Sequence, residues 1–231
     1  MQHLEIGSFS IGTGSAGVQH WVASAIGELC AAHPKLKVIT SERLWYQLPD
    51  ALMASEFDVA LGEASALEGN PDIVVSRLPR RPGSVICRAG HPLTRLARVG
   101  IEDLQRYRLV GPYLARRLGE PFAPDAALGA MSEDSRYFVR AIVCASWNAI
   151  REIVARSDVI AFRARAVLRR PKNVGTLVVL PFEAPWLVTD LAIMWRRDRM
   201  QHPALKAFRD IARRAEALVM GEGQGALHVV A

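Results

Sequence analysis

The sequence predicts an α/β protein made of two lobes, with the second lobe inserted into the first. Three observations lead to this fold class. Short apolar strands alternate with segments of helical periodicity along nearly the whole chain. Proline-containing breaks interrupt this pattern at residues 79–83 and again at residues 181–185. After the second break only one strand and one helix remain, so this last piece is expected to complete the first lobe.

The lobe boundaries follow from these breaks. We expect the first lobe to comprise residues 1–81 and 184–220, and the second lobe to comprise residues 82–183. The chain then crosses between the lobes twice, which predicts a hinge of two segments. The glycine-rich end, residues 221–231, is expected to be a flexible tail.

The first lobe shows an alternation of strands and helices. Period-two or continuous apolar patterns predict its strands, and apolar residues at helical spacing predict its helices. The expected order is a strand at residues 8–12, a helix at 18–30, a strand at 36–40, a helix at 45–53 and a strand at 58–62. A β-α-β-α-β order predicts parallel strands.

The second lobe and the returning segment follow the same logic. One more strand, at residues 73–78, is expected at the end of the first lobe's first part. The second lobe is expected to contain strands at residues 84–88, 108–110, 139–144, 159–162 and 177–180 and helices at 101–105 and 147–156, and the returning segment a strand at 191–195 and a helix at 203–219. Both lobes are therefore expected to resemble the α/β domains that bind nucleotides, with a sheet covered by helices.

The composition favours a globular cytoplasmic protein. Half of the 231 residues are hydrophobic, and no apolar run is long enough to span a membrane, so no membrane partner is expected. The first residues lack the basic and apolar segments of a secretory signal. The net charge of +6 rests mostly on arginines, and no basic stretch is interleaved with aromatic residues as in proteins that bind single-stranded nucleic acid.

The sequence indicates neither a metal site nor a disulfide framework. Cys30, Cys87 and Cys144 are widely spaced, odd in number and surrounded by apolar residues, which predicts reduced thiols that contribute to packing. No metal and no cofactor are expected.

A glycine-rich turn follows the first strand. Residues 12–17 read Gly-Thr-Gly-Ser-Ala-Gly and fit the G-x-G-x-x-G pattern of dinucleotide-binding proteins, with Glu42 placed to receive a ribose hydroxyl. An NAD(P)-dependent oxidoreductase is therefore an alternative interpretation. Glycines are also common in strand-to-helix turns because backbone segments approach closely there, whatever the ligand.

A second interpretation of the same turn needs no nucleotide. Backbone N–H groups at the start of a helix, together with Thr13 and Ser15, would form a donor site for an anion. In the second lobe, Ser146 precedes the helix that begins at Trp147 and is a natural N-cap. We therefore predict that Gly12, Thr13, Gly14, Ser15, Ser146 and Trp147 bind a small, anionic ligand between the lobes.

Catalytic motifs are absent from the sequence. His91 and His202 each precede a proline, which is typical of turn and cap residues rather than of general bases. No G-x-S-x-G, H-E-x-x-H or P-loop pattern occurs. We expect that the protein is not an enzyme.

Five segments in order along the chain resemble LysR-type transcriptional regulators. The most characteristic is Val-Ile-Cys-Arg-Ala-Gly-His-Pro-Leu at residues 85–93, which resembles a hydrophobic strand followed by His-Pro-Leu in that family. The other four are residues 12–14, 45–61, 153–161 and 195–208, so that the resemblance covers about residues 4–219.

This resemblance implies the effector-binding region of such a regulator. It implies the fold of type 2 periplasmic binding proteins, with a small-molecule effector between the lobes. It also implies homodimers or higher oligomers, in which the helix at residues 18–30 of one chain lies near the helix at 147–156 of another. A solute-binding protein of a transporter shares this fold and is a further alternative.

The chain also departs from the family pattern. The DNA-binding winged helix-turn-helix that usually precedes this region is not in the sequence, so DNA binding is expected only through such a missing N-terminal domain. Phe162 and Arg163 replace the more usual Leu-Pro, and Ser157 and Asp158 replace a glycine-rich turn. The identity of the effector therefore does not follow from the resemblance.

Overall fold

The computed structural model describes residues 7–14, 19–67, 70–124, 126–164 and 176–221. The chain forms two compact units. The first contains the described residues up to Gly14, those from 19 to Leu78, and those from Ala192 onward, whereas the second contains the described residues from Pro79 to Leu191. The first unit is therefore discontinuous in sequence. Most of the predicted tail lies outside the described residues.

A five-stranded sheet forms the centre of the first unit, in the strand order β2-β1-β3-β13-β4. Strand β1 pairs in parallel with both β2 and β3, as the β-α-β-α-β order predicts, whereas β4 pairs antiparallel with β13. The strands are β1 (Gly7–Thr13), β2 (Leu36–Glu42), β3 (Val59–Glu63), β4 (Ile73–Arg77) and β13 (Leu191–Arg196).

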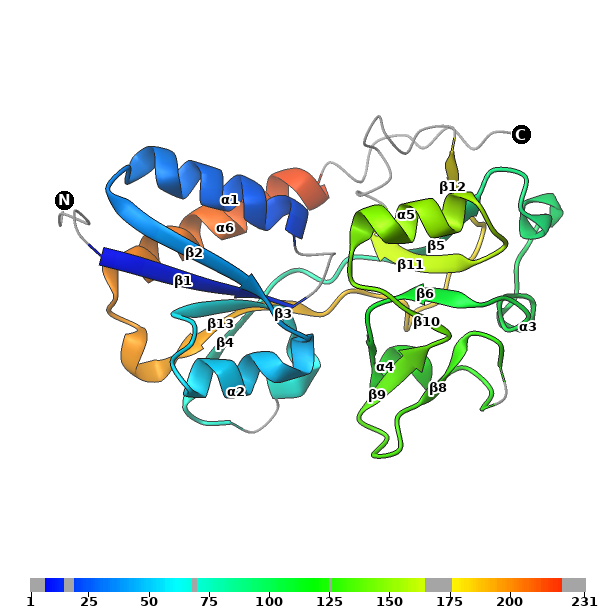
Figure 1. Cartoon of the computed structure of the whole chain (residues 1–231), viewed down its shortest axis with the longest axis horizontal. Coiled ribbons are helices and arrows are strands. Elements are labelled where there is room, and N and C mark those ends of the chain that lie inside the picture. The colour runs from blue at the N-terminus through cyan, green and yellow to red at the C-terminus, as the bar shows by residue number, and fades with distance from the viewer. Residues whose placement is uncertain (1–6, 15–18, 68–69, 125, 165–175, 222–231) are drawn as a thin grey trace. The chain divides into compact units, whose positions relative to one another are not determined.

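Helices cover both faces of this sheet. Figure 1 shows α1 (Gln19–Ala32) and α6 (Pro203–Gly221) along one face and α2 (Leu48–Met53) on the other. Because both faces are covered, the central strands read as continuous apolar runs rather than as alternating ones. Short 3-10 helices occur at Trp45–Gln47, Ala64–Leu67 and Arg197–Arg199.

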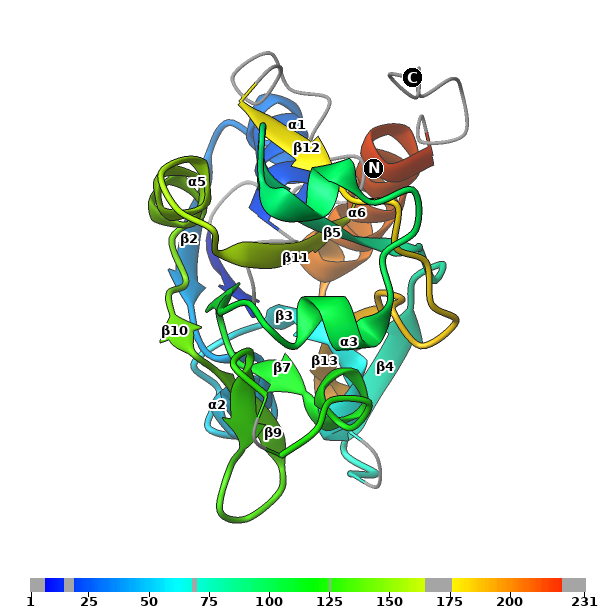
Figure 2. The ribbon, with the colours of Figure 1, turned by 90° about the vertical axis from the view of Figure 1, so that its right-hand side faces the viewer.

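The second unit contains a five-stranded mixed sheet in the order β10-β6-β11-β5-β12. Strands β10, β6 and β11 are parallel, and β5 is antiparallel to β11 and β12. Figure 2 shows β5 and β11 side by side with α5 next to them. The elements of this layer are β5 (Gly83–Arg88), β6 (Leu109–Gly111), β10 (Ile142–Val143), α5 (Trp147–Ala155), β11 (Ile160–Ala164) and β12 (Leu177–Val179).

The second unit also contains a small antiparallel sheet, in the order β7-β9-β8, which the sequence did not predict. The strand expected at residues 139–144 is two strands in different sheets, β9 (Tyr137–Arg140) and β10. The Ala141 N–H still donates to the Leu128 carbonyl at 2.7 Å beside the small sheet, and from Ile142 onward the chain pairs with β6 instead. The remaining elements are β7 (Leu114–Ala115), β8 (Gly129–Met131), α3 (Ile101–Leu104), α4 (Arg116–Gly119) and a 3-10 helix at Pro92–Arg95.

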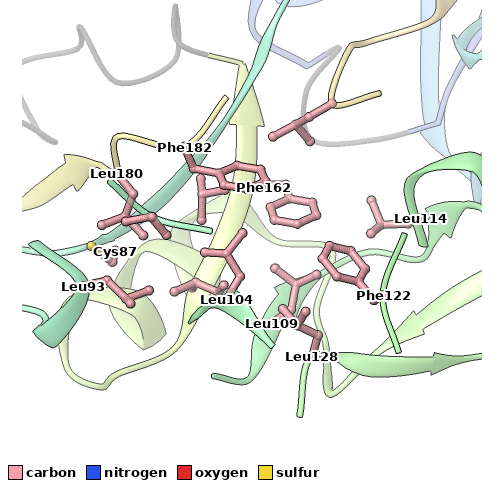
Figure 3. Packing of buried hydrophobic residues seen from close by; sticks show 14 of the residues in the cluster. Cys87, Leu93, Leu104, Leu109, Leu114, Phe122, Leu128, Phe162, Leu180 and Phe182 are labelled. Carbon is pink, nitrogen blue, oxygen red and sulfur yellow. The ribbon is translucent and has the colours of Figure 1, made fainter. Parts of the chain in front are cut away.

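The two sheets of the second unit share an apolar core. Figure 3 shows Leu109 of β6, Phe162 of β11 and Leu104 of α3 in one cluster with Phe122 and Leu128. The ring centroids of Phe122 and Phe162 are 5.9 Å apart, a distance at which aromatic pairs attract each other. This packing joins β6 and β11 of the mixed sheet to the region of the small sheet.

The three cysteines are free thiols, but their environments differ. Cys87 is buried as predicted, and burial raises the pKa of its thiol to about 12, so it stays protonated at neutral pH. Cys144 is half-buried. Cys30 is exposed near the end of α1, so the prediction that all three contribute to packing is wrong for Cys30.

Within the described ranges, no helix is both long and apolar enough to cross a membrane. The same part of the chain contains no group of three or more His, Cys, Asp or Glu side chains that could hold a metal ion.

Replacing Leu104 tests the core of the second unit. Leu104 is fully buried in the cluster of Figure 3, so Leu104→Ala should lower the free energy of unfolding by about 2–5 kcal/mol. Leu96→Ala, at a side chain of the same unit that is 40% exposed, is the matched control and should change it by less than about 1 kcal/mol. Equal losses in urea unfolding would contradict the assignment of this core.

Candidate functional site

The turn after β1 was predicted to bind a ligand through its glycines. Gly12, Thr13 and Gly14 lie at the carboxyl end of β1 and are buried in the first unit. A Cβ on Gly12 would overlap the ring of Phe57, and a Cβ on Gly14 would lie 2.8 Å from Cδ1 of Leu48. Packing inside the unit therefore accounts for Gly12, and it leaves little room for a side chain at Gly14.

The backbone of this turn is also engaged internally. The Gly14 N–H donates to the Leu61 carbonyl at 2.7 Å, and the Thr13 carbonyl accepts from the Arg43 N–H at 3.1 Å. Because these contacts explain the glycines without a bound pyrophosphate, the turn gives no support to the dinucleotide alternative. Ser15, the fourth predicted ligand residue of this turn, lies outside the described residues.

The other predicted ligand residues lie at the start of α5 in the second unit. Ser146 is the N-cap, as predicted, and its hydroxyl accepts from the Ala149 N–H at 3.5 Å. This distance is at the upper limit for a hydrogen bond, so the exposed hydroxyl is only weakly engaged by its helix. The helix begins just after β10, at the carboxyl end of three parallel strands, where open α/β sheets usually bind ligands.

Trp147, the first residue of α5, carries a stacked arginine. The guanidinium carbon of Arg163 lies 4.2 Å from the centroid of the Trp147 ring, a cation–π contact. Arg163 belongs to β11 and is 8% exposed, and its Nη2 is buried without a hydrogen-bond partner. The tryptophan holds this cation in place, but it does not neutralise it.

Arg140 brings a second cation to the same end of the sheet. It ends β9, is 6% exposed, and its Nη1 donates to the Val110 carbonyl at 3.3 Å. Its Nε is buried without a hydrogen-bond partner. The guanidinium lies directly over Gly111, where a Cβ would overlap Nη1, and Gly111 has a φ of +147° that side chains disfavour.

The electrostatics of this pair are unfavourable in the absence of a ligand. Burial, and secondly repulsion from Arg163, lowers the pKa of Arg140 from 12.5 to about 9. Burial likewise lowers the pKa of Arg163 to about 10. Both values lie well above 7, so the two side chains are charged at neutral pH.

Neither arginine has an acidic partner in the part of the chain that the structure describes. By contrast, the more exposed Arg88 of the same unit pairs with Asp158 at 2.7 Å, and the exposed Arg80 pairs with Asp190 at 3.1 Å. Buried charges are normally paired and exposed ones need not be. In the second unit, by contrast, these two more exposed arginines are paired with carboxylates, and among the described residues the two buried ones are not.

The sequence analysis missed Arg140 and noted Arg163 only as a departure from a family pattern. A signal was present, because each of these arginines stands inside a short apolar strand segment, Phe-Val-Arg-Ala-Ile at 138–142 and Ala-Phe-Arg-Ala at 161–164. A charged residue inside an apolar strand segment is buried at a cost unless a counterion accompanies it.

The two histidines next to prolines have structural roles in this fold. His91 is buried at the start of the 3-10 helix Pro92–Arg95, where its Nδ1 accepts from the Leu93 N–H at 3.1 Å. The His202 ring stacks on Phe9 with centroids 6.0 Å apart, just before α6. The interpretation of His91 as a cap residue is confirmed.

The sequence matches one protein family over nearly its whole length. The LysR substrate binding domain family matches residues 2–217. Among curated proteins, a Pseudomonas protein named "SDS degradation transcriptional activation protein" is 27% identical over 216 residues, covering 91% of this chain and 68% of that protein. The transcriptional regulator GalR of Pseudomonas putida is 26% identical over 209 residues, covering 90% of this chain and 51% of that protein.

Solved structures show the same fold at lower identity. The regulatory domain of MetR, a LysR family regulator from N. meningitidis, is 18% identical with a TM-score of 0.69, covering 93% of this chain and 95% of that one. A variant of the OxyR regulatory domain from Pseudomonas aeruginosa is 22% identical with a TM-score of 0.67, covering 91% and 98%. These likenesses establish the type 2 periplasmic binding protein-like fold that the sequence analysis expected.

The contact between Gly111 and Arg140 can be tested by a double-mutant cycle. Gly111→Ala adds a Cβ where the guanidinium lies and forces an unfavourable φ, so it should destabilise the protein by more than about 1 kcal/mol. In the Arg140→Ala background the overlap is gone. The cost of Gly111→Ala should therefore fall by about 0.5–3 kcal/mol. Additive effects on urea unfolding would show that the two residues are not in contact.

Proposed function

Because the chain belongs to the LysR substrate binding domain family, we propose that it is the effector-sensing and dimerisation region of a transcriptional regulator that responds to a small organic anion. The family match over residues 2–217 is the observation that carries this proposal. LysR substrate binding domains are regulatory domains rather than an enzyme family, and we propose that this chain likewise has no catalytic activity of its own.

The anionic character of the effector rests on the charges of the second unit. Arg140 and Arg163 bring two uncompensated positive charges to the carboxyl ends of β6, β10 and β11, next to the start of α5. The relative named for SDS degradation links one member of the family with an organic anion. For this chain we propose only that the effector is an anion, and not that it is the same compound. That the turn at residues 12–15 also contacts the effector stays a prediction.

Regulation requires that the effector bind one state of the domain more tightly than another, because only differential affinity shifts a population. We propose that this shift passes to DNA through the oligomer and through a DNA-binding domain outside the present sequence. The chain covers 51% to 68% of the length of the two curated relatives described above, so the activity of a whole regulator is part of the proposal.

Two edge strands support the proposed pairing of α1 with α5 of a second copy. Strand β2 is at the edge of the first sheet, next to β1, and exposes Ile39 by 44%. Strand β10 is at the edge of the second sheet, just before α5, and exposes Val143 by 51%. Exposed β-branched residues on unpaired strand edges are typical of surfaces that a partner covers.

Ligand binding is tested first by a thermal-shift screen of small organic acids, since a ligand that binds only the folded state raises the unfolding temperature by mass action. With an acid that binds, Ser146→Ala should weaken the affinity about 2- to 10-fold, because one hydrogen bond is lost. The matched control is Ser157→Ala at the opposite end of α5, where the hydroxyl donates to the Ile153 carbonyl at 2.6 Å. Equal affinities for both variants would remove Ser146 from the site.

Dimerisation is tested by sedimentation equilibrium of the chain at increasing concentration. Ile39→Asp and Val143→Asp should each raise the dimer dissociation constant at least about tenfold, because each buries an unpaired charge in the interface. Leu96→Asp, at a leucine that is also exposed, is the control and should leave it unchanged. A wild-type chain that stays monomeric at about 100 µM, well above the micromolar range of ordinary specific association, would contradict the proposed pairing.

A further inference from the structure

We infer that Arg140 and Arg163 together bind the acidic head group of an organic anion, through oxygen atoms that accept from the unpartnered N–H groups of both side chains. This inference rests on the proposed function and deepens it, because it assigns the effector a head-group chemistry and a place in the second unit. It adds two residues that neither the family resemblance nor the motif analysis identified.

The first argument is the missing counterion. A buried guanidinium normally pairs with a carboxylate because removing a lone charge from water is costly. Arg140 and Arg163 are both more than nine-tenths buried, and no carboxylate of the described residues pairs with either. Burial lowers the pKa of Arg140, and the nearby positive charge of Arg163 lowers it further. An anion of charge −1 or −2 would remove this repulsion.

The second argument is that both side chains are held in position without being neutralised. The Val110 carbonyl accepts one N–H of Arg140, and the Trp147 ring supports one face of Arg163. Stacking occupies the face of a guanidinium and leaves the N–H groups on its edge for an acceptor. The Nε of Arg140 and the Nη2 of Arg163 are the donors that remain unused.

The third argument concerns the backbone around the pair. Gly111 admits the Arg140 guanidinium by lacking a Cβ, and its φ of +147° is one that few other residues adopt. The Gly111 carbonyl accepts from the Cys144 N–H at 3.0 Å, so the segment that leads into α5 lies beside Gly111. The nine-residue helix α5 adds the positive end of its dipole near this edge of the sheet. Gly111 thus gives room to the Arg140 side chain, and the start of α5 adds to the positive potential of the two arginines.

The ligand class follows from the donors. A head group that accepts from both arginines needs at least two acceptor oxygens, which carboxylates, sulfate esters and phosphate esters all provide. Cations are repelled, and a neutral sugar or alcohol would leave both charges uncompensated. The shared chemistry is therefore an oxyanion head group.

The minimal probes are inorganic sulfate and inorganic phosphate, titrated into the whole chain at constant ionic strength with chloride as the balancing anion. The unfolding temperature should rise with a saturable dependence on either probe. Arg140→Met and Arg163→Met should each weaken the apparent affinity at least about tenfold, since a charge-assisted hydrogen bond is lost. Arg140→Lys and Arg163→Lys keep the charge without the planar fork, and they should weaken it less.

Arg209→Met provides the matched control. Arg209 also stacks on a tryptophan, with its guanidinium carbon 4.1 Å from the Trp195 centroid, and its Nε is also buried without a partner, but it lies in the first unit. Sulfate and phosphate stabilise most folded proteins by exclusion from their surface, and this effect should be equal in all variants. Each shift is measured against the unliganded midpoint of the same variant, so a change in basal stability does not affect the comparison.

The outcomes separate the inference from the proposed function. If the shifts in Arg140→Met and Arg163→Met equal those in Arg209→Met, or if the wild type shows no saturable response, the anion site is wrong. In that case, binding of another small molecule would still support the effector-sensing function. Hexanoate, hexyl sulfate and hexyl phosphate, with hexanol as the neutral control, then distinguish which head group the site prefers. Preference for hexanol over all three anions would also overturn the inference.

Discussion

The position of β13 is the constraint on which the architecture depends. This strand lies between β3 and β4 in the first sheet, and its residues from Ala192 to Trp195 are almost completely buried. The first unit therefore lacks the middle of its sheet until the chain has passed through the whole second unit and returned. Such a topology makes the second unit an insertion that is connected to the first at two points. Because contacts distant in sequence must form before the core is complete, folding of the first unit is expected to be slow relative to its size.

This topology also determines where functional side chains can lie. In the second unit, β6, β10 and β11 are parallel, so their carboxyl ends meet at one edge, and α5 begins there. Arg163 lies near the carboxyl end of β11, and Arg140 reaches the same edge from the small sheet across Gly111. Arg140 is the last residue of β9, so it stands at the break where the chain passes from the small sheet to β10 of the mixed sheet.

The sequence was sufficient for most of the fold and for part of the site. Long apolar or amphipathic segments, such as α1, α6 and the five strands of the first sheet, leave a periodic signal that local analysis can detect. Strands β7 and β8 are only two and three residues long, so they leave no such signal. The helix cap at Ser146 was predictable because a cap depends only on its neighbours in sequence.

Other features could not be predicted because they depend on partners that are distant in sequence. Gly12 is required by Phe57, which lies 45 positions later, so a dinucleotide motif and a packing requirement look identical in the sequence. Gly111 depends in the same way on Arg140. Arginine is by default a surface residue, and only the structure reveals that Arg140 and Arg163 are buried without a carboxylate.

An uncompensated pair of buried cations is a cost in a protein that only has to fold, but it is useful in a protein that has to sense. A site whose charges were already neutralised by a carboxylate of the chain would gain little from binding an anion, because the ligand would have to replace an existing partner. When no carboxylate of the chain pairs with the two arginines, the favourable interaction between opposite charges forms only when the ligand binds. The stability of the second unit then depends on the occupancy of the site, and a state in which both guanidiniums reach the ligand is favoured over one in which they do not. Differential affinity of this kind is the physical requirement for regulation by an effector.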